Sequence, residues 1–331
     1  MYLIDGEVST KFYQYLCNIF GLKEGVRTRR EIFVAMDFVS KDNKFTYISS
    51  GSKSEGLDLA GSDNDRMAVI QLYRVYGNVY EIHNFQNKMP IVMDTFDVKP
   101  GFTKLKLLHG SPTSFPVKDC CELIEGDYYI SSKLFKEFSL QMELPGDMII
   151  HGPCISNSDA IFDGTYSFCC QEWFSAAHPW IYRSGSSNLY HALITSIVEY
   201  GTLFVPVGSK DSTTEDLEWR ISFSVAEKHL IIFSFSHTQL LCYAVLKILL
   251  KDIIKEEHGD LLCSYFIKTI MLWLNEETSS LYRRPENLIS CFITCLRRLI
   301  YCVKYKTCLQ YFIPDNNLFF IGLKIHSINV Y

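Results

Sequence analysis

The spacing of the apolar residues changes along the chain, and this change limits the possible fold more than any other feature. Between about residues 42 and 167, short apolar runs of β type alternate with turn residues, as in FTYISSG, RMAVIQLY, PIVMDTF, TKLKLL and FDGTYSFCC. From about Leu217 onward the apolar residues recur at helical spacing, most clearly in Leu240–Lys255 and Asn287–Lys304. The pattern predicts an α+β protein in which a mixed sheet is followed by a helical region.

The start of the chain predicts a further helical segment over Leu3–Phe38, broken near Gly21–Gly25. A chain of 331 residues is long enough for two lobes. We place their boundary near Phe174–Ser184, where the strand-like runs stop. We therefore expect one lobe over residues 1–175, which includes the first helix, and a helical lobe over residues 176–331.

Composition argues against several classes of protein. The first residues lack the basic and apolar segments of a secretory signal, and the longest apolar stretches are too short to span a membrane. The 12 cysteines are scattered without a CxxC pair, which favours buried free thiols in a reducing cytosol over disulfides. The formal net charge of −5 argues against a broadly basic surface for nucleic acid, although it allows a local basic patch. We therefore expect a cytoplasmic protein without membrane insertion.

Residues 51–65, GSKSEGLDLAGSDND, carry the clearest chemical pattern. Gly51 and Ser52 follow a strand-like run, where glycine lets backbone N–H groups approach phosphate oxygens and the serine hydroxyl adds a hydrogen bond. Asp63 and Asp65 stand two apart before the next such run, so both carboxylates project to one side. Neighbouring carboxylates repel unless a cation lies between them, and oxygen ligands suit Mg²⁺ or Mn²⁺. A solvated turn before an ordinary strand is the alternative interpretation.

A third carboxylate is predicted from the strand-like run Ile161–Cys170. Its aromatic residues share one face and Asp163 lies on the other, where it would face a cleft. With Asp63 and Asp65 it would complete a two-metal centre, whose ions lie roughly 3.5–4 Å apart, activate an attacking hydroxyl and stabilise a leaving pyrophosphate. The alternative for Asp163 is a turn-forming role at the end of a strand.

These motifs resemble those of the cyclic GMP–AMP synthase-like receptors, in the Mab family of polymerase-β-like nucleotidyltransferases. The resemblance begins with GSKSEGL and SDNDRM and includes EWRISFSVAEKHL at residues 218–230. The other matching segments, in the family's order, lie at residues 93–108, 173–183, 263–273, 286–300 and 311–319. The resemblance implies a two-lobed polymerase-β-like nucleotidyltransferase core with a mixed sheet, a C-terminal helical lobe, and a long first helix that joins the two.

The resemblance also implies an activity. It implies a ligand-activated enzyme that uses two Mg²⁺ or Mn²⁺ ions to condense ATP and/or GTP into a cyclic dinucleotide of the cyclic GMP–AMP type. The product would act on a downstream STING-type receptor in innate immunity and antiviral defence. The alternatives are a non-catalytic Mab-family scaffold on the same fold, and an enzyme that makes linear oligonucleotides or transfers a nucleotide to a protein.

Roles for the first group of site residues follow from the same resemblance. Gly51 and Ser52 would hold the donor triphosphate. Asp63 and Asp65 would bind both metal ions, and Asp163 would bind the ion that activates the acceptor hydroxyl.

A second group of roles belongs to the later segments. Arg220 and Ser224 match positions that contact the nucleotides, Lys247 matches a triphosphate-binding lysine, and Ser264 matches a residue that helps fix the phosphates. Tyr265 matches a residue that stacks on a base. Three of these residues have a plainer alternative. Lys247 also fits the solvent-exposed face of an amphipathic helix, Tyr265 fits a core position, and Arg220 could pair with a carboxylate.

Vertebrate members of the family carry a zinc loop that binds DNA, and this chain departs from them there. At that place only His237 and Cys242 are candidate ligands, too few for a structural zinc site, so we expect no structural zinc. Double-stranded RNA or another nucleic acid could replace DNA as activator. Lys23, Arg27 and Arg30 recur at helical spacing on the first helical segment and could contact phosphates, the alternative being a solvated face.

Overall fold

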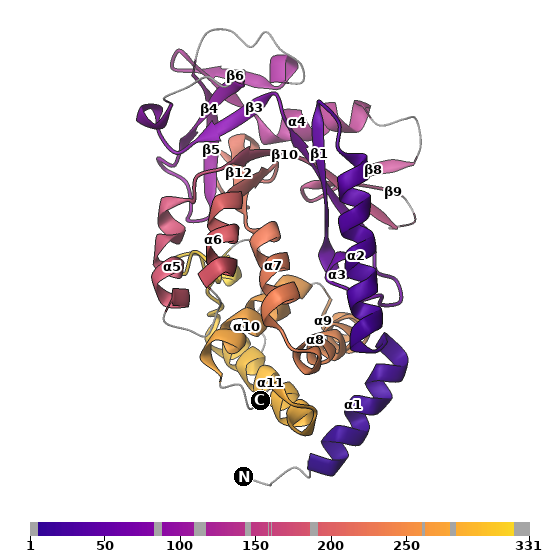
Figure 1. The fold of residues 1–331 in the computed structure, drawn as a ribbon. Coiled ribbons are helices and arrows are strands. Elements are labelled where there is room, and N and C mark those ends of the chain that lie inside the picture. The colour runs from indigo at the N-terminus through magenta and orange to yellow at the C-terminus, as the bar shows by residue number, and fades with distance from the viewer. Residues whose placement is uncertain are drawn as a thin grey trace.

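The computed structural model describes residues 6–82, 88–108, 117–142, 147–157, 159, 161–185, 191–259, 262–278 and 283–320. Strands gather at one end of the molecule and helices at the other (Figure 1). The strands are β1 (Phe45–Ser50), β2 (Asn64–Ile70), β3 (Tyr73–Tyr76), β4 (Met89–Asp94), β5 (Phe102–Leu107), β6 (Cys121–Ile124), β7 (Asp127–Ile130), β8 (Met148–His151), β9 (Cys154–Asn157), β10 (Phe162–Cys170), β11 (Thr202–Val205) and β12 (Glu218–Ser222).

The strands form a mixed sheet, as expected. Its main order is β1-β2-β10-β11-β12-β5-β4-β3, with β6–β7 joined to β5 and β8–β9 joined to β10. The pairs β2–β10 and β3–β4 are parallel, and the other pairs in the described part of the chain are antiparallel. The five strand-like runs found in the sequence correspond to β1, β2, β4, β5 and β10.

Strands also occur later in the chain than expected. The prediction that they stop near Phe174–Ser184 is wrong, because β11 and β12 return to the middle of the sheet. They are only four and five residues long, and so short a strand does not reveal its period. Hydrogen bonding to the long strand β10 on one side and β5 on the other stabilises them there.

The helices confirm the α+β expectation. The predicted segments Leu240–Lys255 and Asn287–Lys304 are helical, the first continuing through a π-helical turn at Leu250–Ile254. None of the helices in the described residues is long and apolar enough to cross a membrane. The helices are α1 (Gly6–Phe20), α2 (Lys23–Ser40), α3 (Gly51–Ser54), α4 (Ser132–Met142), α5 (His178–Gly185), α6 (His191–Tyr200), α7 (Ser224–Ser234), α8 (His237–Leu249), α9 (Lys255–His258), α10 (Ser264–Glu277) and α11 (Leu288–Tyr305).

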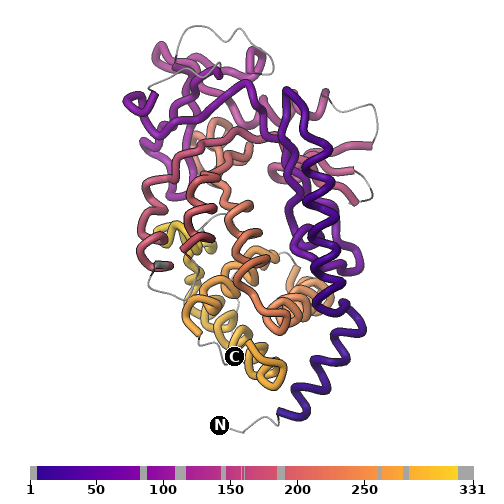
Figure 2. The backbone as a smooth tube through the Cα atoms, in the orientation of Figure 1, coloured from indigo at the N-terminus to yellow at the C-terminus, as the bar shows by residue number. Residues whose placement is uncertain are grey.

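Helices α1 and α2 connect the two ends of the molecule (Figure 2). The predicted break between them falls at Gly21 and Leu22, and Gly21 has a φ of 99°, a conformation that favours glycine. Helix α2 contacts β1 and α3, whereas α1 contacts α8 and α11. The first helical segment therefore touches both the sheet and the C-terminal helices.

Aromatic residues from distant parts of the sequence pack against one another in the core. Phe312 is fully buried, and its ring stacks on that of Phe223 with centroids 4.6 Å apart. Trp180 and Trp173 pack against the same ring at 5.0 and 5.8 Å. The segment after α11 is thereby packed against the start of α7 and the residues that follow β10.

Phe312→Ala is expected to lower the free energy of unfolding by about 3–5 kcal/mol, because it leaves a cavity among rings that cannot close around it. Chemical denaturation followed by circular dichroism measures this. Phe96→Ala is the matched control, since Phe96 is 80% exposed and its loss should cost about 0.5 kcal/mol or less. Equal losses in the two variants would contradict the packing described.

Candidate active site

The acids of the candidate site come from two neighbouring strands. Strands β2 and β10 are parallel, and their register sets Asp65 directly beside Asp163. Asp63 precedes β2, where the N–H of Asn64 donates to the carbonyl oxygen of Ile161 at 2.7 Å. One carboxylate oxygen from each of the three aspartates lies within 4.8 Å of the others. This parallel register brings residues far apart in the sequence to one place.

The acid triad, Asp63 with Asp65 and Asp163, has the chemistry of a cation site. Burial, followed by repulsion from Asp63, raises the pKa of Asp65 to about 7. Burial and then the Asp163 carboxylate also raise the pKa of Asp63. A divalent cation would relieve this repulsion, and carboxylate oxygens are the ligands that Mg²⁺ and Mn²⁺ prefer. The triad could therefore hold a metal ion.

Ser156 on β9 supports the triad and was missed in the sequence. Its hydroxyl donates a hydrogen bond to Oδ1 of Asp163. The antiparallel register of β9 and β10 sets Ser156 opposite Asp163. This contact orients the third carboxylate, and nothing in the spacing of the two residues indicates it.

The Gly-Ser turn lies against the acid triad. Strand β1 pairs with β2 so that Ser50 is opposite Asp65, and Gly51 therefore comes next to the Asp65 side chain. Gly51 has a φ of 68°, and a Cβ there would lie 1.6 Å from Oδ2 of Asp65. Glycine is thus required for two reasons at once. Ser52 is buried in α3, with its hydroxyl 3.5 Å from that of Ser62.

A buried lysine connects this turn to the helices. Nζ of Lys268 on α10 lies 2.8 Å from Oε1 of Glu55 and 3.7 Å from Oε2 of Glu227. The two glutamate side chains are 1% and 6% exposed. Burial alone lowers the pKa of Lys268, but the two carboxylates outweigh burial and hold it well above its ordinary value. We call Glu55, Lys268 and Glu227 the buried charge cluster. Neither glutamate is expected in the site from the sequence, because no local motif marks either residue.

Lys247 on α8 lies close to both sets of charges. Burial lowers its pKa, which Glu55 opposes most strongly, followed among the carboxylates by Asp65 and Asp63. Its Nζ also lies 5.6 Å from the centre of the Tyr243 ring. Lys247 is thus half-buried beside the acids, whereas Lys251, one turn further on, is exposed and donates to the carbonyl oxygen of Ala60 at 3.1 Å.

Tyr265 and Arg220 lie around the other end of the buried charge cluster. The Tyr265 hydroxyl donates to Oε1 of Glu227 at 2.8 Å and accepts from Nε2 of Gln310 at 3.1 Å. Arg220 is half-buried on β12 and acts electrostatically on both Glu227 and Tyr265. The structure therefore brings these two residues together through Glu227.

Ser224 and Ser264 begin helices on this side of the molecule. Ser224 is the first residue of α7, and its hydroxyl contacts Sδ of Met67 at 3.2 Å. Ser264 is the exposed first residue of α10 and lies next to Tyr265 in the chain.

The three basic residues of the first helical segment have different surroundings. Lys23 and Arg27 are exposed, and Arg27 Nε pairs with Oε1 of Glu31 at 2.8 Å. Arg30 is partly buried, and it donates to the carbonyl oxygens of Glu55 at 2.8 Å and Ile232 at 3.3 Å. Arg30 thus ties α2 to α3 and α7, a structural role that its helical spacing does not reveal.

Lys268→Met is expected to lower the free energy of unfolding by about 3–5 kcal/mol at neutral pH, because it leaves two buried carboxylates without a counter-charge. Burial raises the pKa of Glu227, so part of this loss should be regained as the pH falls and Glu227 binds a proton. Urea denaturation at two pH values measures both effects.

Lys11→Met is the matched control for this experiment. Lys11 pairs with Glu7 at 2.6 Å, but both side chains are about 70% exposed, so this pair should contribute at most about 1 kcal/mol. A Lys268 variant as stable as the Lys11 variant would show that the buried charge cluster does not stabilise the fold.

Two comparisons with known proteins bear on the family. Residues 239–330 match the model of the Mab-21 protein HhH/H2TH-like domain. The chain is also 32% identical over 130 residues to "Cyclic GMP-AMP synthase" of Mus musculus. That match covers 35% of this chain and 25% of the mouse protein, so the two correspond over about a quarter of the relative's length.

The first match covers nearly all of α8, which carries Lys247, and all of α10, which carries Tyr265 and Lys268, together with α11. The mixed α+β architecture is consistent with the same family. Together, the domain match and the partial identity make this chain similar, over parts of its length, to proteins of the cyclic GMP–AMP synthase and Mab-21 family.

Proposed function

We propose that this chain is a ligand-activated nucleotidyltransferase that condenses ATP and/or GTP into a cyclic dinucleotide of the cyclic GMP–AMP type. The observation that carries the proposal is the acid triad with the Gly51–Ser52 turn against it. The partial identity to a cyclic GMP–AMP synthase supports the choice of product. A non-catalytic scaffold would have no need for three mutually repelling, partly buried carboxylates at one point.

The residues of the site divide the chemistry between them. Asp63, Asp65 and Asp163 would hold two Mg²⁺ or Mn²⁺ ions. When bound, such ions activate the attacking hydroxyl and stabilise the leaving pyrophosphate. Gly51 and Ser52 would hold the donor triphosphate beside the acids.

Cationic and polar groups would position the two nucleotides. Lys247 lies beside the acids and would bind the triphosphate, which Ser264 would help to fix. Arg220 and Ser224 would contact the nucleotides. Tyr265 would stack on a base, its hydroxyl held in advance by Glu227 and Gln310.

A groove beside the first helical segment is the place we propose for an activator. It has a volume of about 1040 Å³ and lies between α2 and α7. It is lined by basic side chains, Lys23, Arg27 and Lys228 among them, and also by Glu24 and Glu31, so it carries a modest excess of positive charge for a phosphate backbone such as double-stranded RNA. Nζ of Lys228 already donates to the carbonyl oxygen of Ser49 and pairs with Asp37. The donors of Arg30, which also lines the groove, already bind backbone carbonyls. We therefore assign the phosphate contacts chiefly to Lys23 and Arg27.

The wider setting follows from the proposed product. The enzyme would act in the cytoplasm, in innate immunity, upstream of a STING-type receptor of the cyclic dinucleotide. We propose a nucleotidyltransferase core over residues 1–175, whose sheet also includes β11 and β12 from further along the chain, and a helical lobe over the rest of residues 176–331, with the acids in the first and Lys247 in the second.

Asp65→Asn and Asp163→Asn are each expected to lower the rate of product formation by at least about a thousandfold, since metal ligands stabilise the transition state by several kcal/mol. The purified protein is incubated with the four ribonucleoside triphosphates, Mn²⁺ and candidate RNA or DNA. Mass spectrometry and nuclease digestion then identify the product.

Asp58→Asn is the control, because Asp58 is an exposed acid on the loop that leads to the triad. Product formation that survives the Asp65 and Asp163 changes would refute the active-site assignment. Absence of both nucleotide binding and Mn²⁺ binding in the unaltered protein would favour the scaffold. A linear product would contradict cyclisation and favour an enzyme that makes linear oligonucleotides. A protein-linked product would favour transfer of a nucleotide to a protein.

The metal-free protein should gain stability from Asp65→Asn at alkaline pH. The pKa of Asp65 is raised from 3.8 to about 7, so the folded protein holds a proton that the unfolded chain releases. Stability therefore falls as the pH rises between these values. At pH 8 the variant should be more stable by about 1–3 kcal/mol, and at pH 4 the difference should disappear.

Thermal unfolding at both pH values, with and without Mn²⁺, measures this effect. Mn²⁺ should stabilise the unaltered protein and not the Asp65 variant, because a ligand stabilises the state that binds it. A variant that is less stable than the unaltered protein at pH 8 would contradict the repulsion described.

A further inference from the structure

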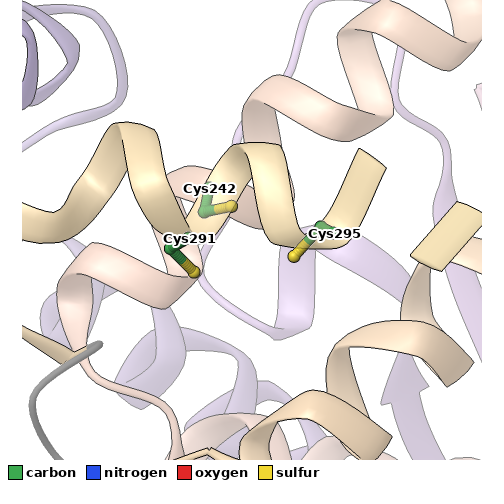
Figure 3. A group of neighbouring side chains, drawn as sticks. All are labelled: Cys242, Cys291 and Cys295. Atoms are coloured by element: carbon green, nitrogen blue, oxygen red, sulfur yellow. The ribbon is translucent and has the colours of Figure 1, made fainter. Parts of the chain in front are cut away.

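Three cysteine side chains lie close together in the C-terminal helices (Figure 3). Cys242 lies on α8, and Cys291 and Cys295 lie on α11. Their Sγ atoms are all within 4.8 Å of one another. The side chains are 0%, 8% and 1% exposed. We call these three residues the thiol cluster.

A fourth sulfur atom borders the thiol cluster. The thiol of Cys295 donates to Sδ of Met271, on α10, at 3.2 Å. A small cavity of about 10 Å³ adjoins Cys291, Cys295 and Met271, which leaves room for about one small ion or water molecule. Sulfur atoms from three helices thus lie together beside a cavity large enough for about one atom.

Packing alone does not require this arrangement. Buried cysteines act as small apolar residues and need no sulfur neighbour. Cys291 and Cys295 are four residues apart, the spacing at which a helix presents two ligands on one face. Cys242 supplies a third ligand from the facing helix, as metal sites between packed helices require.

We propose that the thiol cluster binds one soft metal ion with a filled d shell, Zn²⁺ or Cu(I), through its three sulfur atoms. Thiolates select these ions over Mg²⁺ and Mn²⁺, so the thiol cluster and the acid triad would not compete for metal. Binding would release the protons of the coordinating thiols. The earlier expectation of no zinc counted only His237 and Cys242 near one loop, whereas the fold brings two more thiols to Cys242.

An ion at this point would connect the helices that carry Lys247 and Lys268. Helix α8 carries both Cys242 and Lys247, and α10 carries both Met271 and Lys268. The bound ion would therefore act on the stability of the helical end of the molecule, and on the site only through the position of these helices.

The test uses the full chain, purified with reductant and chelator to remove metal. The protein is titrated anaerobically with Cu(I) and, separately, with Zn²⁺, each in competition with a chromophoric chelator for that ion. We expect one equivalent of at least one ion to be withheld from the chelator. Removing a ligand in Cys242→Ala, Cys291→Ala or Cys295→Ala should weaken that binding by at least about tenfold.

Cys302→Ala is the matched control, since Cys302 is equally buried on α11 but lies outside the thiol cluster. Thermal unfolding should show a rise in Tm with metal in the unaltered protein and in this control, and a smaller rise in the variants of the thiol cluster. Mn²⁺ binding at the acid triad reports whether each variant is folded.

X-ray absorption at the metal edge of the unaltered protein needs no variant. Three sulfur neighbours at about 2.3 Å would support the proposal. Coordination by nitrogen and oxygen alone would overturn it. So would equal metal retention by the unaltered protein and the three cysteine variants, or failure of the unaltered protein to retain either ion.

Discussion

The ion pair of Lys268 with Glu55 is the interaction on which the rest of the site depends. Glu55 immediately follows α3, which begins at the glycine of the Gly-Ser turn, and Lys268 lies on α10 among the helices. The pair is nearly inaccessible to water, so neither charge can be lost without leaving the other uncompensated. Arg30 binds the backbone carbonyl of the same Glu55 from α2. One residue of the turn is thus held from the first helical segment and from the C-terminal helices at once.

The two groups of charges near this ion pair have opposite effects on the stability of the fold. The buried charge cluster matches one lysine with two glutamates, whereas the acid triad collects carboxylates that raise the pKa values of Asp63 and Asp65. Repulsion of this kind lowers the stability of the unliganded fold. A ligand that removes the repulsion binds more tightly for the same reason. Lys247 interacts electrostatically with carboxylates of both groups. The acid triad therefore holds a repulsion that a bound cation would relieve.

The sequence predicted which residues form strands and helices better than it predicted which of these elements lie next to one another. Periodicity located β1, β2, β4, β5, β10 and the long helices, because each is long enough to show its period. It could not place β11 and β12, which are short and take their structure from the strands beside them. The acids and the Gly-Ser turn are visible as local motifs. The parallel register that joins Asp65 to Asp163, the pairing of Glu55 with Lys268 and the convergence of Cys242 with Cys291 all depend on long-range topology. No spacing along the chain encodes these contacts.

The close approach of Gly51 to Asp65 has a consequence for how a lineage carrying this fold can change. Any side chain at Gly51 would occupy the position of the Asp65 carboxylate, so a substitution there would disturb the Gly-Ser turn and the acid triad together. At this position the turn and the acids therefore cannot vary independently.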